Sequence, residues 1–355
     1  MKLARNAVKH KRVPHGGLYS IPNPHSTILD FSSNVNPLGC PPSVAKALRN
    51  AMSRIPIYPD RDSKALKEKI AKHLGIHQSR ITIGNGATEI IYNFCRATLW
   101  KGKSTLIPAP TFGEYEAASK LCDARISFFK TMCLQDDVKE FVRKIPQGGI
   151  VFVCNPNNPT GELIPKEIML QILRRAKRKQ ATIFIDECFA ELTTSQESLV
   201  GHVSEFENLF VLRSLTKSFG LAGLRIGYGI GNKKIISVLE NIKIPWNVSG
   251  IAQEAAALAL KEKKFLARTQ KLIHTESEYL KNSISKIPGL SCYDSKTNFI
   301  LIRTKMHSNL LQKKLLKKGI LVRDCSTFRG LDSHYIRIAV RTHKENLMLV
   351  KALGS

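Results

Sequence analysis

Residues 214–225 read Ser-Leu-Thr-Lys-Ser-Phe-Gly-Leu-Ala-Gly-Leu-Arg. Lys217 follows the hydroxyl residues Ser214 and Thr216 and precedes Arg225 by eight positions. A lysine amine condenses with an aldehyde to form an imine, and hydroxyls together with a guanidinium bind a phosphate. A cofactor that carries both an aldehyde and a phosphate is pyridoxal 5'-phosphate (PLP), so this run predicts a PLP site. Taken alone, the run is also compatible with a solvated surface loop.

A second segment places a carboxylate at the end of an apolar run. Residues 183–187 read IFIDE, which predicts a buried parallel strand that ends at Asp186. Open α/β sheets bind ligands at the carboxyl ends of their strands. A PLP enzyme needs an acid there, because the protonated pyridine ring is the form that accepts electrons.

Two further predicted strands end in polar turns. Residues 150–154 (IVFVC) precede 155–161 (NPNNPTG), where Asn158 can hydrogen-bond the phenolic oxygen of the cofactor. Residues 81–83 precede 84–89 (GNGATE) and a helical stretch, whose free N–H groups and positive dipole end suit a phosphate. Each segment has an ordinary explanation as a cap, turn or hairpin, but their joint occurrence favours a cofactor site.

Apolar runs alternate with helical patterns over most of the chain, which predicts βαβ units and a mainly parallel sheet covered on both faces. The strands are expected at 104–107, 126–129, 150–154, 182–186, 208–213 and 226–230, and the helices at 63–74, 87–99, 113–122 and 165–179. Ser63 is the expected N-cap of the first helix. The pattern from 248 to 287 is helical and strands return at 298–303 and 335–340, which predicts a smaller α+β lobe.

These motifs resemble those of the fold-type I PLP-dependent enzymes, the aspartate aminotransferase superfamily. The matching segments are 84–89, 155–161, 186–189 (Asp-Glu-Cys-Phe) and 214–225, and the likeness covers residues 14 to 353. The resemblance implies an α/β protein of the fold-type I PLP-dependent transferases, with a mainly parallel sheet. It also implies a large PLP-binding domain at residues 45–250 and a smaller α+β domain made of 1–44 and 251–355.

The family's roles carry over to the matching positions. The resemblance makes Lys217 and Asp186 the catalytic residues: Lys217 forms the imine and returns a proton to the substrate carbon, and Asp186 pairs with the ring nitrogen. Asn158 bonds the phenolic oxygen and Phe112 stacks on the ring. The cofactor phosphate is assigned to Gly86, Ala87, Thr88, Ser214, Thr216 and Arg225. Tyr58 resembles a tyrosine that reaches the phosphate of a neighbouring subunit, which implies a homodimer, although a tyrosine before a proline is also an ordinary surface residue.

Within the superfamily the chain is similar to the histidinol-phosphate aminotransferase branch, and finer marks resemble its threonine-phosphate decarboxylases. These marks are 15–17 (HGG), 30–39 (DFSSNVNPLG), 211–217 (VLRSLTK) and 330–341 (GLDSHYIRIAVR). Many aminotransferases have a tyrosine three residues after the aspartate, where this chain has Phe189. A phenylalanine cannot donate a hydrogen bond to the phenolic oxygen, and the decarboxylases resemble this chain at that position.

The resemblance also implies a substrate pocket. Arg337 matches an arginine that binds the substrate carboxylate, and Arg323 matches one that binds a substrate phosphate. The other expected pocket residues are His15, Asn34, Asn36, Asn158 and Arg341. His15 beside two glycines is equally compatible with an ordinary loop histidine.

The expected reaction is decarboxylation of L-threonine O-3-phosphate to (R)-1-aminopropan-2-ol O-phosphate and CO₂, a step of cobalamin biosynthesis. Transamination of histidinol phosphate and decarboxylation of serine phosphate are the alternatives. A third hypothesis is a PLP fold that serves as a basic nucleic-acid or regulatory binder. The intact set of Lys217, Asp186 and Arg225 argues against it, because a protein without catalysis has no need of all three.

Composition limits the remaining possibilities. A chain of 355 residues exceeds one usual domain, and its eight cysteines form no C-x-x-C pair, which favours reduced thiols in the cytoplasm and no metal site. No apolar run is long enough to span a membrane, and the basic segment 1–12 lacks the apolar core of a signal peptide. The net charge of +27 comes with only 7% aromatic residues, so we expect solvated helix faces and no nucleic-acid partner.

Overall fold

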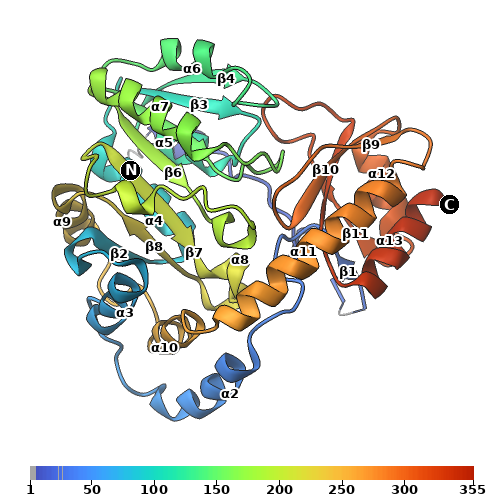
Figure 1. Cartoon of the computed structure of the whole chain (residues 1–355), viewed down its shortest axis with the longest axis horizontal. Coiled ribbons are helices and arrows are strands. Elements are labelled where there is room, and N and C mark those ends of the chain that lie inside the picture. The colour runs from blue at the N-terminus through green and yellow to red at the C-terminus, as the bar shows by residue number, and fades with distance from the viewer. Residues whose placement is uncertain (1–4, 23, 26) are drawn as a thin grey trace.

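The main sheet of the protein, seen in a computed structural model that describes residues 5–22, 24–25 and 27–355, has seven strands in the order β2-β8-β7-β6-β5-β3-β4 (Figure 1). Strand β8 is antiparallel to both of its neighbours, and the other strand pairs are parallel. The strands are β2 Ile81–Asn85, β3 Ser104–Ala109, β4 Arg125–Lys130, β5 Ile150–Cys154, β6 Thr182–Asp186, β7 Leu209–Ser214 and β8 Ile226–Ile230. The predicted mainly parallel α/β sheet is therefore confirmed.

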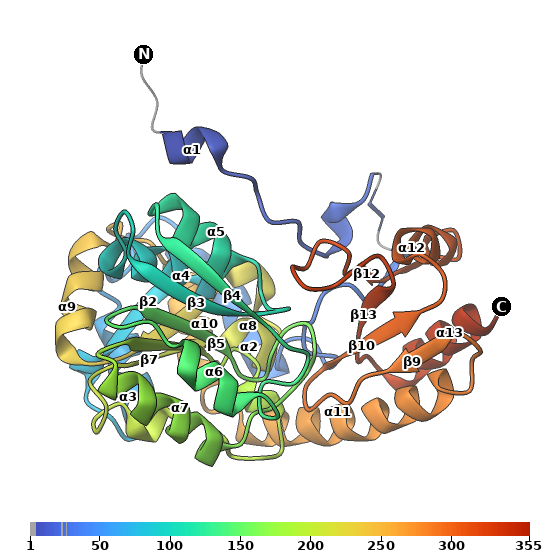
Figure 2. The same ribbon diagram turned by 90° about the horizontal axis from the view of Figure 1, so that it is seen from above.

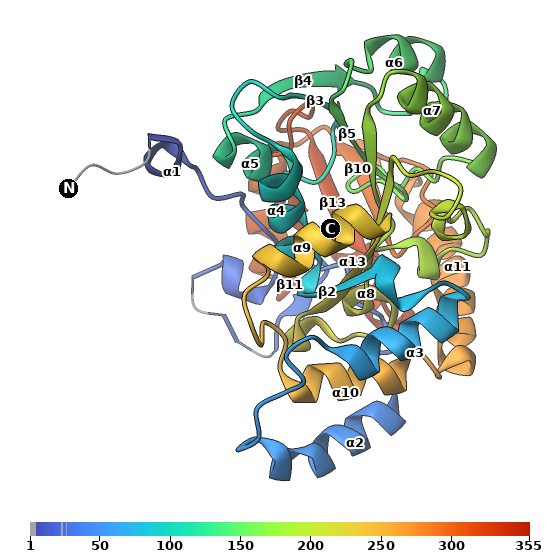
Figure 3. The same cartoon turned by 90° about the vertical axis from the view of Figure 1, so that its left-hand side faces the viewer.

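Helices cover both faces of this sheet because successive strand residues point to opposite sides. In β5, Val151 and Val153 belong to the core on one face and Phe152 to the core on the other. The first face packs against α3 Lys64–Leu74, α6 Val138–Lys144, α7 Lys166–Arg178 and α10 Gly250–Ala259. The second packs against α4 Gly86–Thr98, α5 Glu114–Leu121 and α9 Lys233–Ile242. Figure 3 looks onto α9, which contacts α4 and β2.

A four-stranded antiparallel sheet, β12-β13-β10-β9, lies beside the main sheet (Figure 2). Its strands are β9 Leu290–Cys292, β10 Phe299–Thr304, β12 Arg323–Asp324 and β13 Tyr335–Ala339. Near it, the N-terminal strand β1 Leu29–Asp30 pairs in parallel with β11 Ile320–Leu321. The remaining helices are α1 Arg5–Lys9, α2 Pro42–Ala51, α8 Leu215–Ser218, α11 Lys263–Ile284, α12 Ser308–Leu316 and α13 His343–Gly354.

The long helix α11 connects the two sheets (Figure 2). Its residues Phe265, Ile273 and Leu280 enter three different clusters of the core, two on the faces of the main sheet and one under the four-stranded sheet. The N-terminal strand β1 therefore lies among C-terminal elements. The domain boundaries, 45–250 against 1–44 and 251–355, stay a prediction.

Ser63 occupies the N-cap position of the helix at 64–74, as expected, but its side chain does not cap the helix. Ser63 precedes α3, but its backbone has a φ of 51° and its side chain makes no capping hydrogen bond. The Asp60 carboxylate accepts from the backbone N–H groups of Lys64 (2.6 Å) and Ala65 (3.4 Å) instead. A carboxylate three residues before the cap position reaches the free amides because the left-handed residue turns the chain back over them.

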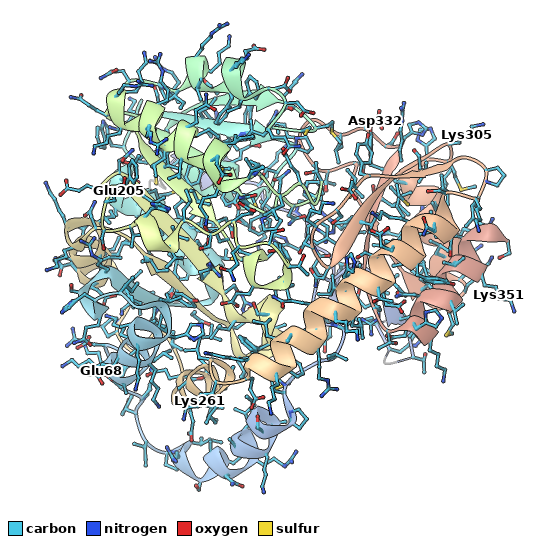
Figure 4. All side chains as sticks on the ribbon, viewed as in Figure 1. Glu68, Glu205, Lys261, Lys305, Asp332 and Lys351 are labelled. Carbon is cyan, nitrogen blue, oxygen red and sulfur yellow. The ribbon has the colours of Figure 1, made fainter. Side chains whose placement is uncertain are left out.

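The positive charge is distributed over exposed helix faces. In α7, Arg174, Lys177 and Arg178 are exposed, whereas Ile172 and Leu173 are buried. Lys351 of the C-terminal helix His343–Gly354, labelled in Figure 4, lies at the edge of the molecule and is exposed. Among the described residues no helix is long and apolar enough to cross a membrane, and no three His, Cys, Asp or Glu side chains gather as metal ligands.

Candidate active site

A cavity of about 1720 Å³ opens at the carboxyl ends of β5, β6 and β7 and extends to the four-stranded sheet. Parallel strands end at one edge of a sheet, so Cys154, Asp186 and Ser214, the last residues of three adjacent strands, meet there. The predicted site residues that line the cavity are His15, Asn34, Ala87, Thr88, Phe112, Asn158, Asp186, Ser214, Thr216, Lys217, Arg225, Arg323 and Arg337.

Lys217 lies in the short helix α8, directly after β7. Desolvation by the surrounding protein lowers the pKa of its amine to about 8, and the positive charges of Arg337 and Arg225 act in the same direction. The amine lies 5.9 Å from the centre of the Phe189 ring. A lysine with this pKa is partly neutral near pH 7, which is the state that attacks an aldehyde.

Asp186 ends β6 as a buried carboxylate. Its Oδ1 accepts from the backbone N–H of Cys188 at 2.9 Å, and its Oδ2 accepts from the Tyr115 hydroxyl at 2.6 Å. Burial raises the pKa of this carboxyl, and the bonds from Cys188 and Tyr115 counteract the rise. Among the described residues Asp186 forms no ion pair, so a protonated pyridine nitrogen fits it as a missing positive partner.

The start of α4 and Arg225 together form a cradle that fits a phosphate. Gly86, at the first position of α4, has a φ of 80°, and a Cβ there would lie 2.5 Å from Nη2 of Arg225. The next two residues, Ala87 and Thr88, line the cavity with the first turn of the helix, where N–H groups have no helical partner. The one hydrogen bond of the Arg225 side chain in the described structure, Nη1 to the Ala222 carbonyl at 3.3 Å, leaves other N–H groups for a ligand.

Arg323 and Arg337 lie side by side on the wall of the cavity. They are directly paired residues in the antiparallel register of β12 and β13, and both are buried. Arg337 donates to Oδ1 of Asn158 and, at 2.9 Å, to the Ser32 carbonyl, while Arg323 donates to the Pro14 carbonyl at 2.7 Å. Burial lowers the pKa of Arg337 to about 10, and the positive charge of Arg323 acts in the same direction. In the described structure the hydrogen bonds of both guanidinium groups go to neutral oxygen atoms.

The N-terminal segment passes across the cavity and brings His15 into it. Nε2 of His15 lies 2.6 Å from Oε1 of Glu114, and the other oxygen of that carboxylate accepts from the Tyr92 hydroxyl at 2.6 Å. Burial acts to raise the pKa of Glu114, but the hydrogen bonds from His15 and Tyr92 lower this pKa below its ordinary value. The imidazole also lies 5.8 Å from the Phe112 ring. A buried carboxylate therefore fixes the orientation of this histidine at the cavity.

Two predicted substrate residues are placed elsewhere. Asn36 does not line the cavity: its amide donates to the Ser218 carbonyl (2.7 Å) and to Thr269 Oγ1 (3.1 Å), and its Oδ1 accepts from the Leu38 N–H. Arg341 is likewise outside the cavity, because it bonds the Asp30 carbonyl and Glu345. Asn36 lies in the loop before α2 and Arg341 in the loop after β13, and each loop directs its side chain into hydrogen bonds away from the cavity, which corrects the expectation that they contact substrate.

Gly86 and Tyr58 are not among the lining residues either, for different reasons. Gly86 lies behind the Arg225 guanidinium, where its missing side chain makes room. Tyr58 is 81% exposed and its ring contacts Trp246 at 5.3 Å between centroids. Its prediction concerns a second subunit, so the position of Tyr58 on the surface of one chain leaves that prediction open.

Sequence reasoning missed the two residues next to Phe112 that organise the site. Tyr115 binds Asp186 and Glu114 binds His15, and both belong to α5. A signal was available for Tyr115, because it lies three positions after Phe112 in the first turn of the helix expected at 113–122. Glu114 carried no such signal, since an acid in the first turn of a helix is ordinary.

Comparison with known proteins agrees with this geometry. The sequence pattern of the family "Aminotransferase class I and II" matches residues 26–353. The chain is 37% identical over 355 residues to a protein of Caldanaerobacter subterraneus subsp. tengcongensis named "Putative threonine-phosphate decarboxylase", covering 97% of this chain and 94% of that one.

Two solved structures have the same fold as this chain. The histidinol-phosphate aminotransferase from Clostridium acetobutylicum superposes with a TM-score of 0.85 at 33% identity, and the L-threonine-O-3-phosphate decarboxylase from Porphyromonas gingivalis with 0.84 at 28%. Each comparison covers 92% of this chain and 98% of the other. The chain therefore belongs to the class I and II aminotransferase family, whose members share the fold-type I architecture and use pyridoxal 5'-phosphate.

Proposed function

We propose that this enzyme decarboxylates L-threonine O-3-phosphate to (R)-1-aminopropan-2-ol O-phosphate and CO₂, as a step of cobalamin biosynthesis. The observation that carries the proposal is the pair Arg323 and Arg337, held side by side on the cavity wall by the β12–β13 register. Two adjacent guanidinium groups suit a substrate with two anionic groups, a phosphate and a carboxylate. Histidinol phosphate carries only the phosphate.

The roles of the residues follow from their surroundings. When bound, the cofactor supplies an aldehyde and a ring that accepts the electrons of the Cα bond perpendicular to its plane. The Asp186 carboxylate holds a proton at the ring nitrogen, and the Asn158 amide, whose Oδ1 accepts from Arg337, has its N–H groups left to donate to the phenolic oxygen. In decarboxylation the bond from Cα to the carboxylate breaks, CO₂ leaves, and Lys217 delivers a proton to Cα.

The assignment of cofactor phosphate and substrate phosphate to separate arginines is part of the proposal. Arg225 and the start of α4, with Ser214 and Thr216, form one anion site, and Arg323 with His15 forms the other. Asn34 also lines the cavity, and its Oδ1 has no hydrogen-bond partner among the described residues. This buried acceptor is available to the amine of a substrate.

Two features favour decarboxylation over transamination. Phe189 stands where a generic aminotransferase would have a tyrosine donor, and the 37% identical relative bears a decarboxylase name. Transamination of histidinol phosphate remains the second candidate, because the histidinol-phosphate aminotransferase of Methanococcus maripaludis is 33% identical over 92% of this chain. Decarboxylation of serine phosphate is a closer alternative to the proposed reaction. Serine phosphate lacks only the methyl group of threonine phosphate, and one methyl group is worth about 1–3 kcal/mol of discrimination.

The proposed assembly is a homodimer in which Tyr58 reaches the site of the partner. Large apolar side chains around it are exposed, namely Met52, Ile55, Ile57, Ile244 and Trp246. Isolated exposed apolar residues are common, but a group on neighbouring segments marks an interface. A second copy of the chain is the occupant that this proposal requires.

The experiment that tests the proposed reaction is a substrate panel. Purified enzyme loaded with PLP is incubated with L-threonine phosphate, L-serine phosphate or histidinol phosphate, each with and without 2-oxoglutarate. We expect CO₂ and aminopropanol phosphate from threonine phosphate without 2-oxoglutarate, and less turnover of serine phosphate. Activity that requires 2-oxoglutarate and forms glutamate would establish the aminotransferase instead.

The lowered pKa of Lys217 predicts a pH dependence of cofactor binding. At pH 7 an amine with a pKa of about 8 is roughly 10% neutral, against roughly 0.03% for an ordinary lysine. The rate at which apo-protein forms its covalent bond to PLP, followed by visible absorbance, should therefore rise with pH to a plateau with a midpoint near 8. Replacing Arg337 with glutamine should move the midpoint upward, because it removes a nearby positive charge.

The same shift has a stability consequence with a defined sign. The native pKa of Lys217 lies below its unfolded value, so between pH 8 and the ordinary value of 10.5 the unfolded chain binds more protons. The contribution of this lysine to the free energy of unfolding of the apo-protein should rise with pH across that window. If the rate at which apo-protein forms its covalent bond to PLP did not change between pH 6 and pH 10, this result would contradict the environment assigned to the Lys217 amine.

A further inference from the structure

Tyr115 is a buried residue that contacts both Asp186 and Phe112, the two residues predicted to bind the cofactor ring. Its hydroxyl donates to Oδ2 of Asp186 at 2.6 Å, and its side chain is fully buried. Its ring meets the Phe112 ring edge to face, with centroids 5.7 Å apart and planes at 78°. The same ring stacks on Phe152 of β5 at 5.3 Å and 12°, which fixes it against the main sheet.

Asp186 is assigned to the nitrogen of the cofactor ring, and Phe112 is assigned to its face. We propose that Tyr115 is a positioning residue that holds Asp186 and Phe112 in register for the pyridine ring of PLP. The proposal rests on the cofactor roles assigned to those two residues, but it does not depend on which reaction the enzyme catalyses.

The hydroxyl matters because Asp186 has few other partners. Its second donor is the backbone N–H of Cys188 at 2.9 Å, which bonds the other carboxylate oxygen. Without the phenol, Oδ2 would face the apolar surroundings of β5 and β6 with one donor fewer, and an ionised carboxylate there would be less stable. The Tyr115 hydroxyl itself stays protonated, since burial and the charge of Asp186 raise its pKa.

Tyr115→Phe tests the proposal because it removes one oxygen and keeps the ring. The probe is pyridoxamine 5'-phosphate, which has the ring and phosphate of the cofactor but no aldehyde, so its affinity reports the noncovalent contacts alone. We expect its dissociation constant to increase about tenfold, as for the loss of a hydrogen bond to a charged group. The visible circular dichroism of bound PLP should also change, because the ring is less firmly oriented.

The matched control is Tyr228→Phe. Tyr228 is also fully buried, and its hydroxyl has no hydrogen-bond partner among the described residues. Deleting that hydroxyl should leave the dissociation constant and the dichroism unchanged. Thermal unfolding of both apo-variants shows whether the tyrosine change acts on the site or on the fold.

A double-mutant cycle with Asp186→Asn shows whether Tyr115 acts through the carboxylate. A neutral amide gains less from the phenol, so the loss caused by Tyr115→Phe should shrink to about twofold in that background. Equal losses in both backgrounds, or unchanged affinity and dichroism in Tyr115→Phe, would overturn the proposal. Either result would leave the proposed decarboxylation intact, because no turnover is measured.

Discussion

Replacing Lys217 with alanine is expected to lower kcat by about 10⁴-fold or more, because the variant loses both the covalent attachment to the cofactor and the group that returns a proton to Cα. PLP should still bind, since Asp186 and the cradle of Gly86 and Arg225 remain. Absorbance should then show bound cofactor that sodium borohydride does not fix to the protein. Turnover is measured by CO₂ release.

Two controls make the result specific to the amine. Thermal unfolding should show an apo-variant at least as stable as the parent at pH 7, since a partly charged, desolvated amine has been removed. Added methylamine should restore part of the activity, because a small amine can carry the missing proton. Near-normal turnover without added amine would remove Lys217 from its assigned role.

The second large effect separates the two anion sites. Arg323→Ala and Arg337→Ala should retain PLP but raise KM for the phosphorylated substrate, because each removes a buried partner of a substrate anion. Loss of one partner from a desolvated charge pair costs about 2–5 kcal/mol, or about 30- to 5000-fold. Arg225→Ala should instead weaken PLP retention by about tenfold, a smaller effect because Arg225 is exposed.

Dialysis followed by absorbance measures PLP retention, and initial rates give KM. Arg341→Ala is the matched control, since this arginine of the same lobe bonds Asp30 and Glu345 outside the cavity. It should change neither KM nor PLP retention. If Arg323→Ala and Arg337→Ala lose PLP and still bind substrate normally, the assignment of the two sites is wrong.

The main sheet can be predicted from the sequence for a physical reason. The strands of a parallel sheet are apolar throughout, so a carboxylate such as Asp186 or a hydroxyl such as Ser214 marks the strand end unambiguously. Parallel strands then bring their ends to one edge. Asp186 and Ser214 line the cavity, as does Lys217 in the helix that follows β7, whereas Gly86, which follows β2, does not.

Loop side chains are predicted less well because their direction depends on tertiary contacts. Asn36 and Asn34 are two residues apart, yet Asn34 lines the cavity and Asn36 bonds Ser218 and Thr269. Ser63 occupies the N-cap position with a left-handed backbone, and the Asp60 carboxylate, not the Ser63 hydroxyl, accepts from the free N–H of Lys64. In each position the local residue type is compatible with both outcomes, and only the folded chain decides between them.

The most direct test of the central claim uses L-threonine phosphate that carries deuterium at Cα. Decarboxylation breaks the bond from Cα to the carboxylate and leaves the Cα–D bond intact, so mass spectrometry should find one deuterium retained in aminopropanol phosphate, together with one equivalent of CO₂. Transamination breaks the Cα–D bond itself. Loss of the deuterium to solvent, with a 2-oxo acid as product and no CO₂ released, would contradict the proposed reaction.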